Sequence, residues 1–273
     1  MGIELVGGIL ANSLALVADA GHMATDAAAL GLSLWAARLA VRPASPERTY
    51  GWVRAEILAA LANGAAILAI AGWIAWEAWG RLAAPVEIDG PLMVGVAIVG
   101  LLVNVIVALL LHRDAAHSLN VRGAYLHVLG DLLGSVGALT AGLVILLTGW
   151  APADPLVSLL ISGLLVIAAW RLMKEASHIL LESAPPHVDV PALGAELAEI
   201  PGLSDIHDLH VWTLTSGLVA LSGHGISDEP AEYARLLDDV RTVAAGWGIA
   251  HVTFQLEPRK LVQLGALPAP GSE

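Results

Sequence analysis

The sequence contains no cysteine, and this absence restricts the chemistry open to the protein. Without thiols there is no disulfide framework and no thiolate ligand, so any metal must be held by His, Asp, Glu, backbone or water. Soft Cu(I) chemistry is therefore disfavoured. Basic residues are also scarce, since 13 Lys and Arg stand against 25 Asp and Glu, a net charge of -12. A chain without basic patches is not expected to bind nucleic acid.

Motifs of several energy-coupled or hydrolytic proteins are missing as well. The sequence has no GxxxxGK[ST] phosphate loop and no DKTG stretch, so primary pumping is disfavoured. It also lacks HExxH, the zinc motif of metalloproteases. These absences leave secondary transport, metal binding and proton transfer as the functions to be weighed.

Charged residues make up only 14% of the 273 residues and hydrophobic ones 57%, which is typical of a polytopic membrane protein. The apolar segment 3–17 contains Glu4 and has no basic residue before it, so we do not expect it to be a signal peptide. It would reach about 22 Å, short of the roughly 30 Å hydrocarbon core, so we expect a truncated first helix. Five longer runs predict further spans at 20–39, 55–79, 92–111, 126–147 and 156–172.

The basic residues are distributed unequally between the two sides of this predicted six-helix bundle. One side holds Arg81 alone, whereas the loops after helices two and four and the exit from helix six hold Arg38, Arg42, Arg48, Arg54, Arg113, Arg122, Arg171 and Lys174. Positive charge in short loops is typical of the cytoplasmic side. The pattern predicts a multi-pass protein with both termini in the cytoplasm, and the short loops and Ala/Leu-rich helices favour a bacterial inner membrane.

Two copies of an HxxxD motif lie inside the apolar runs, His22 with Asp26 and His127 with Asp131. Residues four apart share one face of a helix, and ionisable residues inside a membrane usually serve a function. Two such helices facing each other would offer two imidazoles and two carboxylates, the tetrahedral shell that suits Zn²⁺. For either motif alone, the alternative is a polar contact that joins two helices.

Other functions of a paired HxxxD site have to be considered. Zinc with an open coordination position activates water, but the paired motifs form a closed shell without a spare acid, which disfavours an intramembrane metalloenzyme. An intramembrane proton relay and a metal-sensing membrane protein without transport both remain alternatives, because Asp and His pairs suit either role. The physiological ion among Zn²⁺, Cd²⁺, Co²⁺ and Fe²⁺ also stays open, since selectivity depends on geometry.

The sequence after the bundle predicts a small α+β domain. Pro185 and Pro186 end the membrane domain, residues 1–184, because neither can continue a helix. Within 185–260 we expect a helix at 190–200, strands at 204–214 and 218–225, a helix at 230–245 and a strand at 251–256. This αββαβ order fits an α+β sandwich, and the Pro/Gly/Ala-rich residues 261–273 are expected to be disordered. Strand alternation would put His207 and His210 on opposite faces.

The chain resembles the cation diffusion facilitators, and within that family the zinc-transporting branch. The resemblance is carried by SLALVADAGHMATD at 13–26, YGWVR at 50–54, SLNVRGAYLHVLGD at 118–131 and HDLHVW at 207–212. It implies a homodimeric transporter that exports Zn²⁺ in exchange for protons, with six transmembrane helices per subunit and a ferredoxin-like cytoplasmic domain.

The resemblance also implies roles for individual residues. His22, Asp26, His127 and Asp131 correspond to the transport site. The cytoplasmic metal positions fall near His207, His224, His251 and Glu257, whereas His210 matches the family motif without a ligand role. Two features depart from the family: the short first helix, and a short loop between helices four and five with only His112 and His117.

Overall fold

The computed structural model describes residues 1–112, 119–215 and 217–259, without the side chains of residues 119–124, 126 and 127. Its contacts divide the chain into two compact units. The bundle unit consists of Met1–Trp35 and Ala59–Lys174, and the sheet unit of Ala36–Leu58 and Glu175–Glu273. The expected disorder of 261–273 and the loop residue His117 lie outside the described residues.

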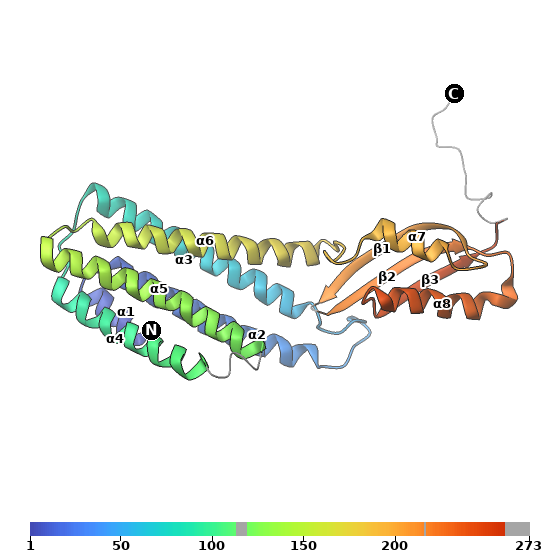
Figure 1. The fold of residues 1–273 in the computed structure, drawn as a ribbon, viewed down its shortest axis with the longest axis horizontal. Helices are drawn as coiled ribbons and strands as arrows, with labels where there is room; N and C mark the ends of the chain where they lie inside the picture. The colour runs from blue at the N-terminus through green and yellow to red at the C-terminus, as the bar shows by residue number, and fades with distance from the viewer. Residues whose placement is uncertain (113–118, 216, 260–273) are drawn as a thin grey trace, which may run out of the picture. The chain divides into compact units, whose positions relative to one another are not determined.

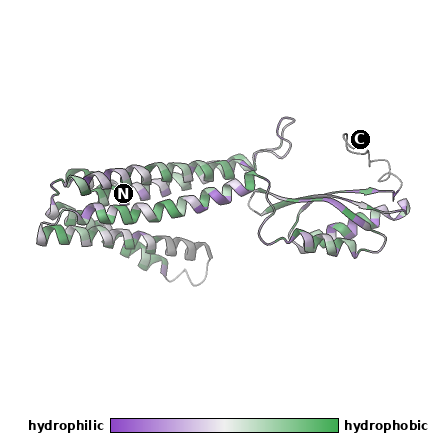
Figure 2. Cartoon of the chain, turned by 90° about the horizontal axis from the view of Figure 1, so that it is seen from above, coloured by the Kyte–Doolittle hydropathy of each residue, from purple (hydrophilic) through white to green (hydrophobic). Residues whose placement is uncertain are grey.

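Six helices form the first part of the chain (Figure 1). They are α1 (Gly2–Leu10), α2 (Leu14–Ala40), α3 (Ala55–Ala83), α4 (Gly90–His112), α5 (Leu119–Thr148) and α6 (Ala153–Leu180). Four segments are long and apolar enough to cross a membrane, namely α3, α4, Val128–Thr148 of α5, and α6. Figure 2 shows how apolar residues dominate these helices. The predicted six-helix bundle of a membrane protein is confirmed.

The boundary between the first two helices differs from the prediction. We expected one apolar segment over 3–17 and a second from 20, but α1 ends at Leu10 and α2 begins at Leu14. Asn12 has a φ of 57°, a left-handed conformation that cannot continue a helix. Asn12 and Ser13 interrupt the apolar pattern here, and Ser is a preferred residue at the start of a helix, but mean hydropathy over the whole segment does not locate the break.

Asp154 of α6 supplies the cap that starts α2. Its fully buried carboxylate accepts hydrogen bonds from the backbone N–H groups of Leu14 (2.8 Å) and Ala15 (3.0 Å) and from the Ser13 hydroxyl (2.6 Å). The first N–H groups of a helix have no partner within the helix, and an acid is favourable at that end. Ser13 adds a local cap, since its hydroxyl accepts a hydrogen bond from the Leu16 N–H (3.3 Å). The start of α2 is therefore held both by its own Ser13 and by a residue 140 positions away in the chain.

Small apolar side chains let the bundle helices approach one another closely. Ala11 and Ala15 near the start of α2 pack with Met93 of α4 and with Ala138 and Ala141 of α5. Every one of these side chains is at most 1% exposed. Small residues at helix contacts are how membrane helices associate, because lipid offers no hydrophobic driving force between them.

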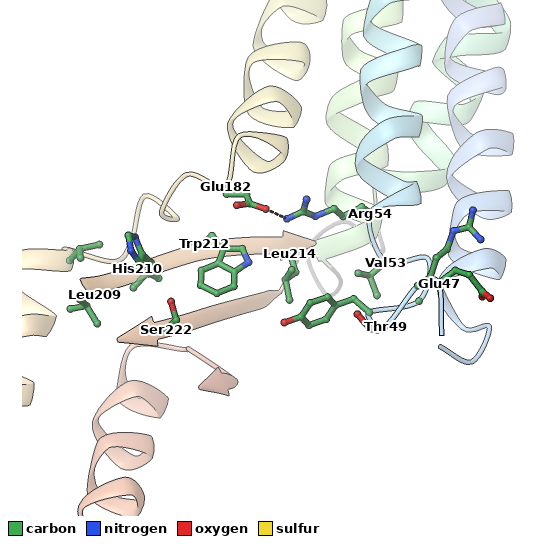
Figure 3. Close-up of a pocket in the computed structure, with 15 residues that line it drawn as sticks. Glu47, Thr49, Val53, Arg54, Glu182, Leu209, His210, Trp212, Leu214 and Ser222 are labelled. Carbon is green, nitrogen blue, oxygen red and sulfur yellow. Dashed lines mark hydrogen bonds and ion pairs between the residues drawn. The ribbon is translucent and has the colours of Figure 1, made fainter. Parts of the chain in front are cut away.

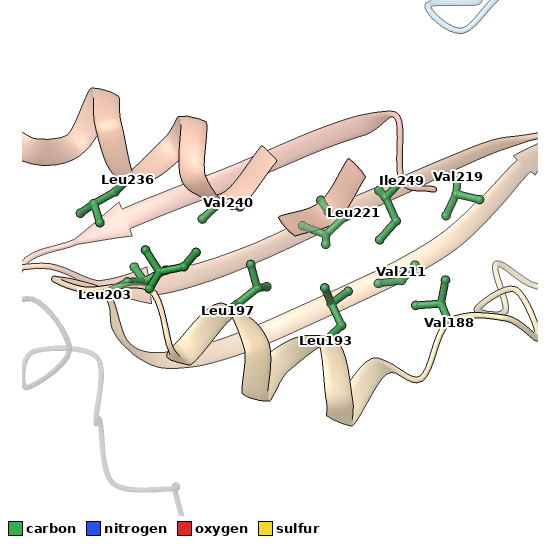
Figure 4. Packing of buried hydrophobic residues seen from close by; sticks show 12 residues of the cluster. Val188, Leu193, Leu197, Leu203, Val211, Val219, Leu221, Leu236, Val240 and Ile249 are labelled. Carbon is green, nitrogen blue, oxygen red and sulfur yellow. The ribbon is translucent and has the colours of Figure 1, made fainter. Parts of the chain in front are cut away.

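The sheet unit contains α7 (Val190–Ala198), β1 (Ser204–Thr215), β2 (Leu218–Ile226), a 3₁₀ turn η2 (Pro230–Glu232), α8 (Tyr233–Gly246) and β3 (His251–Glu257). The predicted αββαβ order is confirmed, although the helix expected at 230–245 is α-helical only from Tyr233. β2 is central, antiparallel to β1 and parallel to β3. Figure 4 shows Leu193 and Leu197 of α7 and Leu236 and Val240 of α8 packed on the sheet. Both helices thus cover one face.

Irregular pairing along β1 changes which side chains share the uncovered face. His207 pairs with His224 and His210 with Ser222, so Asp208 and Leu209 of β1 together oppose the single residue Gly223 of β2. Asp208 has a φ of 51°, the geometry of a β-bulge. The prediction that His207 and His210 lie on opposite faces is therefore wrong, because strict alternation does not hold across a bulge.

Candidate metal centres

Three side chains of the two HxxxD motifs meet inside the bundle. Nδ1 of His22 lies 3.5 Å from an Asp26 oxygen on the same helix, and its Nε2 lies 3.6 Å from an Asp131 oxygen on α5. One ligand atom from each residue lies within 4.8 Å of the other two. Asp131 is buried, while His22 and Asp26 are partly exposed. The i, i+4 spacing on α2 thus brings one imidazole and one carboxylate to a carboxylate of a second helix.

These separations are close to those of a tetrahedral zinc shell. With bonds of about 2.0–2.1 Å, the ligand atoms around Zn²⁺ lie about 3.3–3.4 Å apart. The two separations involve opposite nitrogens of the His22 ring, and one imidazole gives one lone pair to an ion, so a single ion could not use both contacts as they stand. Ligand atoms of all three residues lie within 4.8 Å of one another, so a turn of the His22 ring would let the three groups hold a divalent cation.

The fourth predicted residue of this site, His127, belongs to α5, but its side chain lies outside the described residues. His127 precedes Asp131 by four positions, so its place on the helix is one turn away on the same side. The backbone is consistent with a ligand there, and the role of His127 stays a prediction.

A second group of possible ligands lies on the uncovered face of the sheet. Glu257 at the end of β3 has one oxygen 2.9 Å from Nδ1 of His224 and the other 3.6 Å from Nε2 of His207. The rings of His207 and His224 are 5.5 Å apart. These three residues also offer ligand atoms within 4.8 Å of one another, and each is partly buried. Three residues of the predicted cytoplasmic set thus come together.

Hydrogen bonds orient the two imidazoles of this group. Nδ1 of His207 lies 2.8 Å from the carbonyl of Asp205, and a carbonyl only accepts, so Nδ1 carries the proton. Nε2 of His207 faces Glu257, and a metal-binding histidine is typically held in this way by a hydrogen bond from its other nitrogen. Asp208 stands beside them, 3.9 Å from Nε2 of His224. Its hydrogen bond with His210 (2.8 Å) lowers the pKa of Asp208 below its ordinary value.

His251 does not belong to this group. It pairs with Ala220 at the opposite end of β3, and its Nε2 lies 3.5 Å from the hydroxyl of Tyr50. The two rings meet edge to face, with centroids 5.7 Å apart. Even spacing puts His251 and Glu257 on one face of β3, but they lie six positions apart, at opposite ends of the strand.

A cavity of about 930 Å³ lies in the sheet unit, between the segment 47–54 and β1 (Figure 3). Trp212, Leu214 and His210 of β1 line it together with Arg54, whose guanidinium forms a 3.0 Å ion pair with Glu182. This pair ties the start of α3 to the segment that leads out of α6. Both partners are substantially exposed, so the pair adds little stability.

The structure also reveals polar residues that the motif analysis did not assign. Asp19 and Glu4 are buried in the bundle at 3% exposure, together with Asn104 of α4 and Ser135 of α5. Each acid lies in an apolar run, and that alone could have marked both as functional candidates. Helical spacing places Asp19 one turn from His22 and Ser135 one turn from Asp131. What the sequence does not show is that Asp19, Ser135 and Asn104 meet across three helices.

The comparison with known proteins identifies the family. Residues 1–181 match the family model described as the cation efflux transmembrane domain. This chain belongs to the cation efflux family. The resemblance to the cation diffusion facilitators, and within them to the zinc-transporting branch, is confirmed, and the protein is a multi-pass membrane transporter rather than an enzyme.

Relatives within the cation efflux family match almost the whole chain. The "Cadmium, cobalt and zinc/H(+)-K(+) antiporter" of Bacillus subtilis is 42% identical over 260 residues, which cover 93% of this chain and 84% of that protein. The "Zinc transporter ZitB" of Escherichia coli is 44% identical, covering 93% and 82%. The "Metal cation efflux system protein CzcD" of Cupriavidus metallidurans is 41% identical, covering 93% and 81%.

Proposed function

We propose that this cation efflux protein is a secondary Zn²⁺/H⁺ antiporter that exports zinc from the cytoplasm across a bacterial plasma membrane. The observation that carries the proposal is the meeting of His22, Asp26 and Asp131, from two helices of a membrane bundle, with ligand atoms within 4.8 Å. One imidazole and two carboxylates suit a borderline divalent ion. Relatives named as zinc, cadmium and cobalt transporters support the same substrate class.

His127 completes the site in this proposal. With it the shell has two nitrogens and two oxygens, two ligands from α2 and two from α5, and no position left for a reactive water. Such a closed shell binds an ion without activating chemistry on it. Because the ligands are divided between two helices, a relative shift of α2 and α5 would break the shell and release the ion.

Exchange with protons follows from the ligands themselves. A metal binds neutral imidazole and ionised carboxylate, so loading the site displaces protons and protonation helps to expel the ion. Unperturbed histidine titrates near pH 6.5, within the range of physiological gradients. The alkaline side of the membrane would therefore load zinc, and the acidic side would discharge it.

The sheet unit is assigned a regulatory role on the cytoplasmic side. The asymmetric distribution of Lys and Arg supports cytoplasmic termini, and the resemblance supports a homodimer. His207, His224 and Glu257 would bind zinc there when its concentration rises. Since these ligands lie in a separate unit from His22 and Asp131, they would tune transport rather than perform it.

The decisive experiment is zinc flux in sealed inside-out vesicles with an imposed pH difference and an internal pH dye. We expect zinc accumulation that depends on the gradient and a matching proton movement. Asp131→Asn keeps the shape of the side chain but removes its charge, so it should abolish both signals. Proton movement without zinc flux would indicate a proton relay instead. Zinc binding without any flux would indicate a metal sensor.

A further inference from the structure

A buried chain of polar groups extends from the transport site into the bundle. The Asn104 amide of α4 donates a hydrogen bond of 3.1 Å to the hydroxyl of Ser135 on α5. That hydroxyl lies 3.3 Å from an oxygen of Asp19 on α2 and donates to it. All three residues are at most 5% exposed. Three helices therefore direct polar groups to one point inside an otherwise apolar bundle.

This chain lies next to the metal ligands. Asp19 precedes His22 by three positions on α2, and Ser135 follows Asp131 by four on α5. Residues three or four apart are neighbours on one face of a helix, about one turn or 5.4 Å along the axis. Asp19 and Ser135 thus form the next layer of the same helix pair, one turn from His22 and Asp131.

The packing around Asp19 is arranged to admit a carboxyl group. Gly134 of α5 faces it, and a Cβ at this glycine would lie 2.9 Å from the Asp19 oxygen. Across the bundle Gly100 of α4 faces Glu4 in the same manner, where a Cβ would collide with the carboxyl. α5 and α4 thus each have a glycine at the position that faces a buried acid. If this contact only stabilised the bundle, a neutral amide or hydroxyl group could make it without the free-energy cost of burying a charge.

The surroundings of Asp19 contain a hydrogen-bond donor and several acids. In the described part of the chain, Ser135 is the only residue that donates a hydrogen bond to its carboxyl. The titratable groups that face Asp19 are Glu4 of α1, Asp131 of α5 and the Met1 ammonium, which forms a 2.7 Å ion pair with Glu4. Its own helix adds His22 and Asp26. Acidic neighbours therefore predominate around a group that can take up a proton.

We propose that Asp19 carries a counter-proton of the zinc exchange and that Ser135 links it to the layer of Asp131. The inference rests on the proposed function of the HxxxD site. When Zn²⁺ loads, the O–H bond of the Asp19 carboxylic acid breaks and the proton leaves to water, so the remaining carboxylate offsets part of the ion's charge. When Asp19 takes a proton again on the other side, that compensation is lost and the zinc is released.

The coupling must be reciprocal. A proton on Asp19 weakens zinc binding by the same factor by which zinc weakens proton binding. A coupling of this kind is typically about 5- to 150-fold in affinity. Removing the titratable group should therefore leave a zinc site whose affinity depends less on pH, whereas removing a ligand would destroy the site.

The test is a count of protons released per zinc bound, by purified full-length protein in detergent, for wild type and for Asp19→Asn. We expect the variant to bind zinc with the wild-type stoichiometry but to release about one proton fewer per ion. Asp19→Glu should restore the proton. Ser162→Ala is the matched control, because this buried hydroxyl of α6 has no hydrogen-bond partner among the described residues.

Infrared difference spectra of the wild type provide a measurement that does not depend on a variant. Zinc should remove a carbonyl band of a protonated carboxylic acid, and this band should shift when aspartate is labelled with ¹³C. The inference is overturned if labelled aspartate shows no such band. It is equally overturned if Asp19→Asn releases as many protons as wild type, or loses zinc binding while Ser162→Ala keeps it. A wild type that shows the band but moves no zinc in vesicles, together with an Asp19→Asn variant that lacks the band, would refute the transport function while leaving Asp19 as the linked proton site.

Discussion

Replacing Asp154 by Ala tests whether α2 owes its starting point to an acid on α6. The substitution removes the acceptor of the Leu14 and Ala15 N–H groups, both in a fully buried environment. A buried donor left without a partner costs about 1–3 kcal/mol, so the two N–H groups together predict a loss of about 2–6 kcal/mol. The Ser13 hydroxyl is left out of this sum because it can rotate toward another acceptor.

A matched control exists at the start of α4. Asp89 accepts a 3.0 Å hydrogen bond from the Leu92 N–H, but this cap is exposed. Asp89→Ala should therefore cost only about 0.5–2 kcal/mol, the ordinary range for a cap. Asp154→Asn keeps one acceptor oxygen and should fall between the two alanine variants.

The measurement is the free energy of unfolding in mixed micelles, followed by tryptophan fluorescence, with zinc affinity measured on the same samples. Because α2 carries His22 and Asp26, we expect Asp154→Ala also to weaken zinc binding at the transport site, and Asp89→Ala to leave it unchanged. If Asp154→Ala is no more destabilising than Asp89→Ala, the cap does not hold α2 and this reasoning is wrong.

Three further predictions concern the transport site, the regulatory group and the core of the sheet unit. His22→Asp replaces a borderline nitrogen by a hard oxygen and should raise competition by Mn²⁺ and Cd²⁺ relative to Zn²⁺ in flux assays, whereas an unchanged profile would mean that His22 does not touch the ion. Glu257→Gln should weaken zinc binding to the sheet unit with flux reduced but not abolished, and complete loss of flux at normal expression would contradict a tuning role. Leu236→Ala removes a fully buried side chain of α8 and should destabilise this unit by about 2–5 kcal/mol in chemical denaturation, well beyond the effect of Leu181→Ala at an exposed position.

Much of this architecture was readable from local patterns. Long apolar runs predicted the bundle because a membrane admits only segments whose backbone groups are bonded internally. The αββαβ order was predicted from the spacing of apolar residues, which recur every second residue in a half-buried strand and about every 3.6 residues in a helix. The duplicated HxxxD motif indicated a shared site, because an i, i+4 pair in an apolar helix faces one way. The break at Asn12 was missed, since it depends on a backbone conformation and on Asp154 rather than on hydropathy.

The sequence by itself determined the membrane class, the order of the elements and the His and Asp residues that can bind a cation, because composition and periodicity are local properties. Only the tertiary structure decided which of these groups meet. The β-bulge at Asp208 puts His207 and His210 on one face of the sheet. The length of β3 separates His251 from Glu257, so His251 is not part of the ligand group. The tertiary structure also joined Asp19, Ser135 and Asn104 across three helices. Contacts between residues far apart in the chain arise from helix packing and strand register, and no local pattern encodes either.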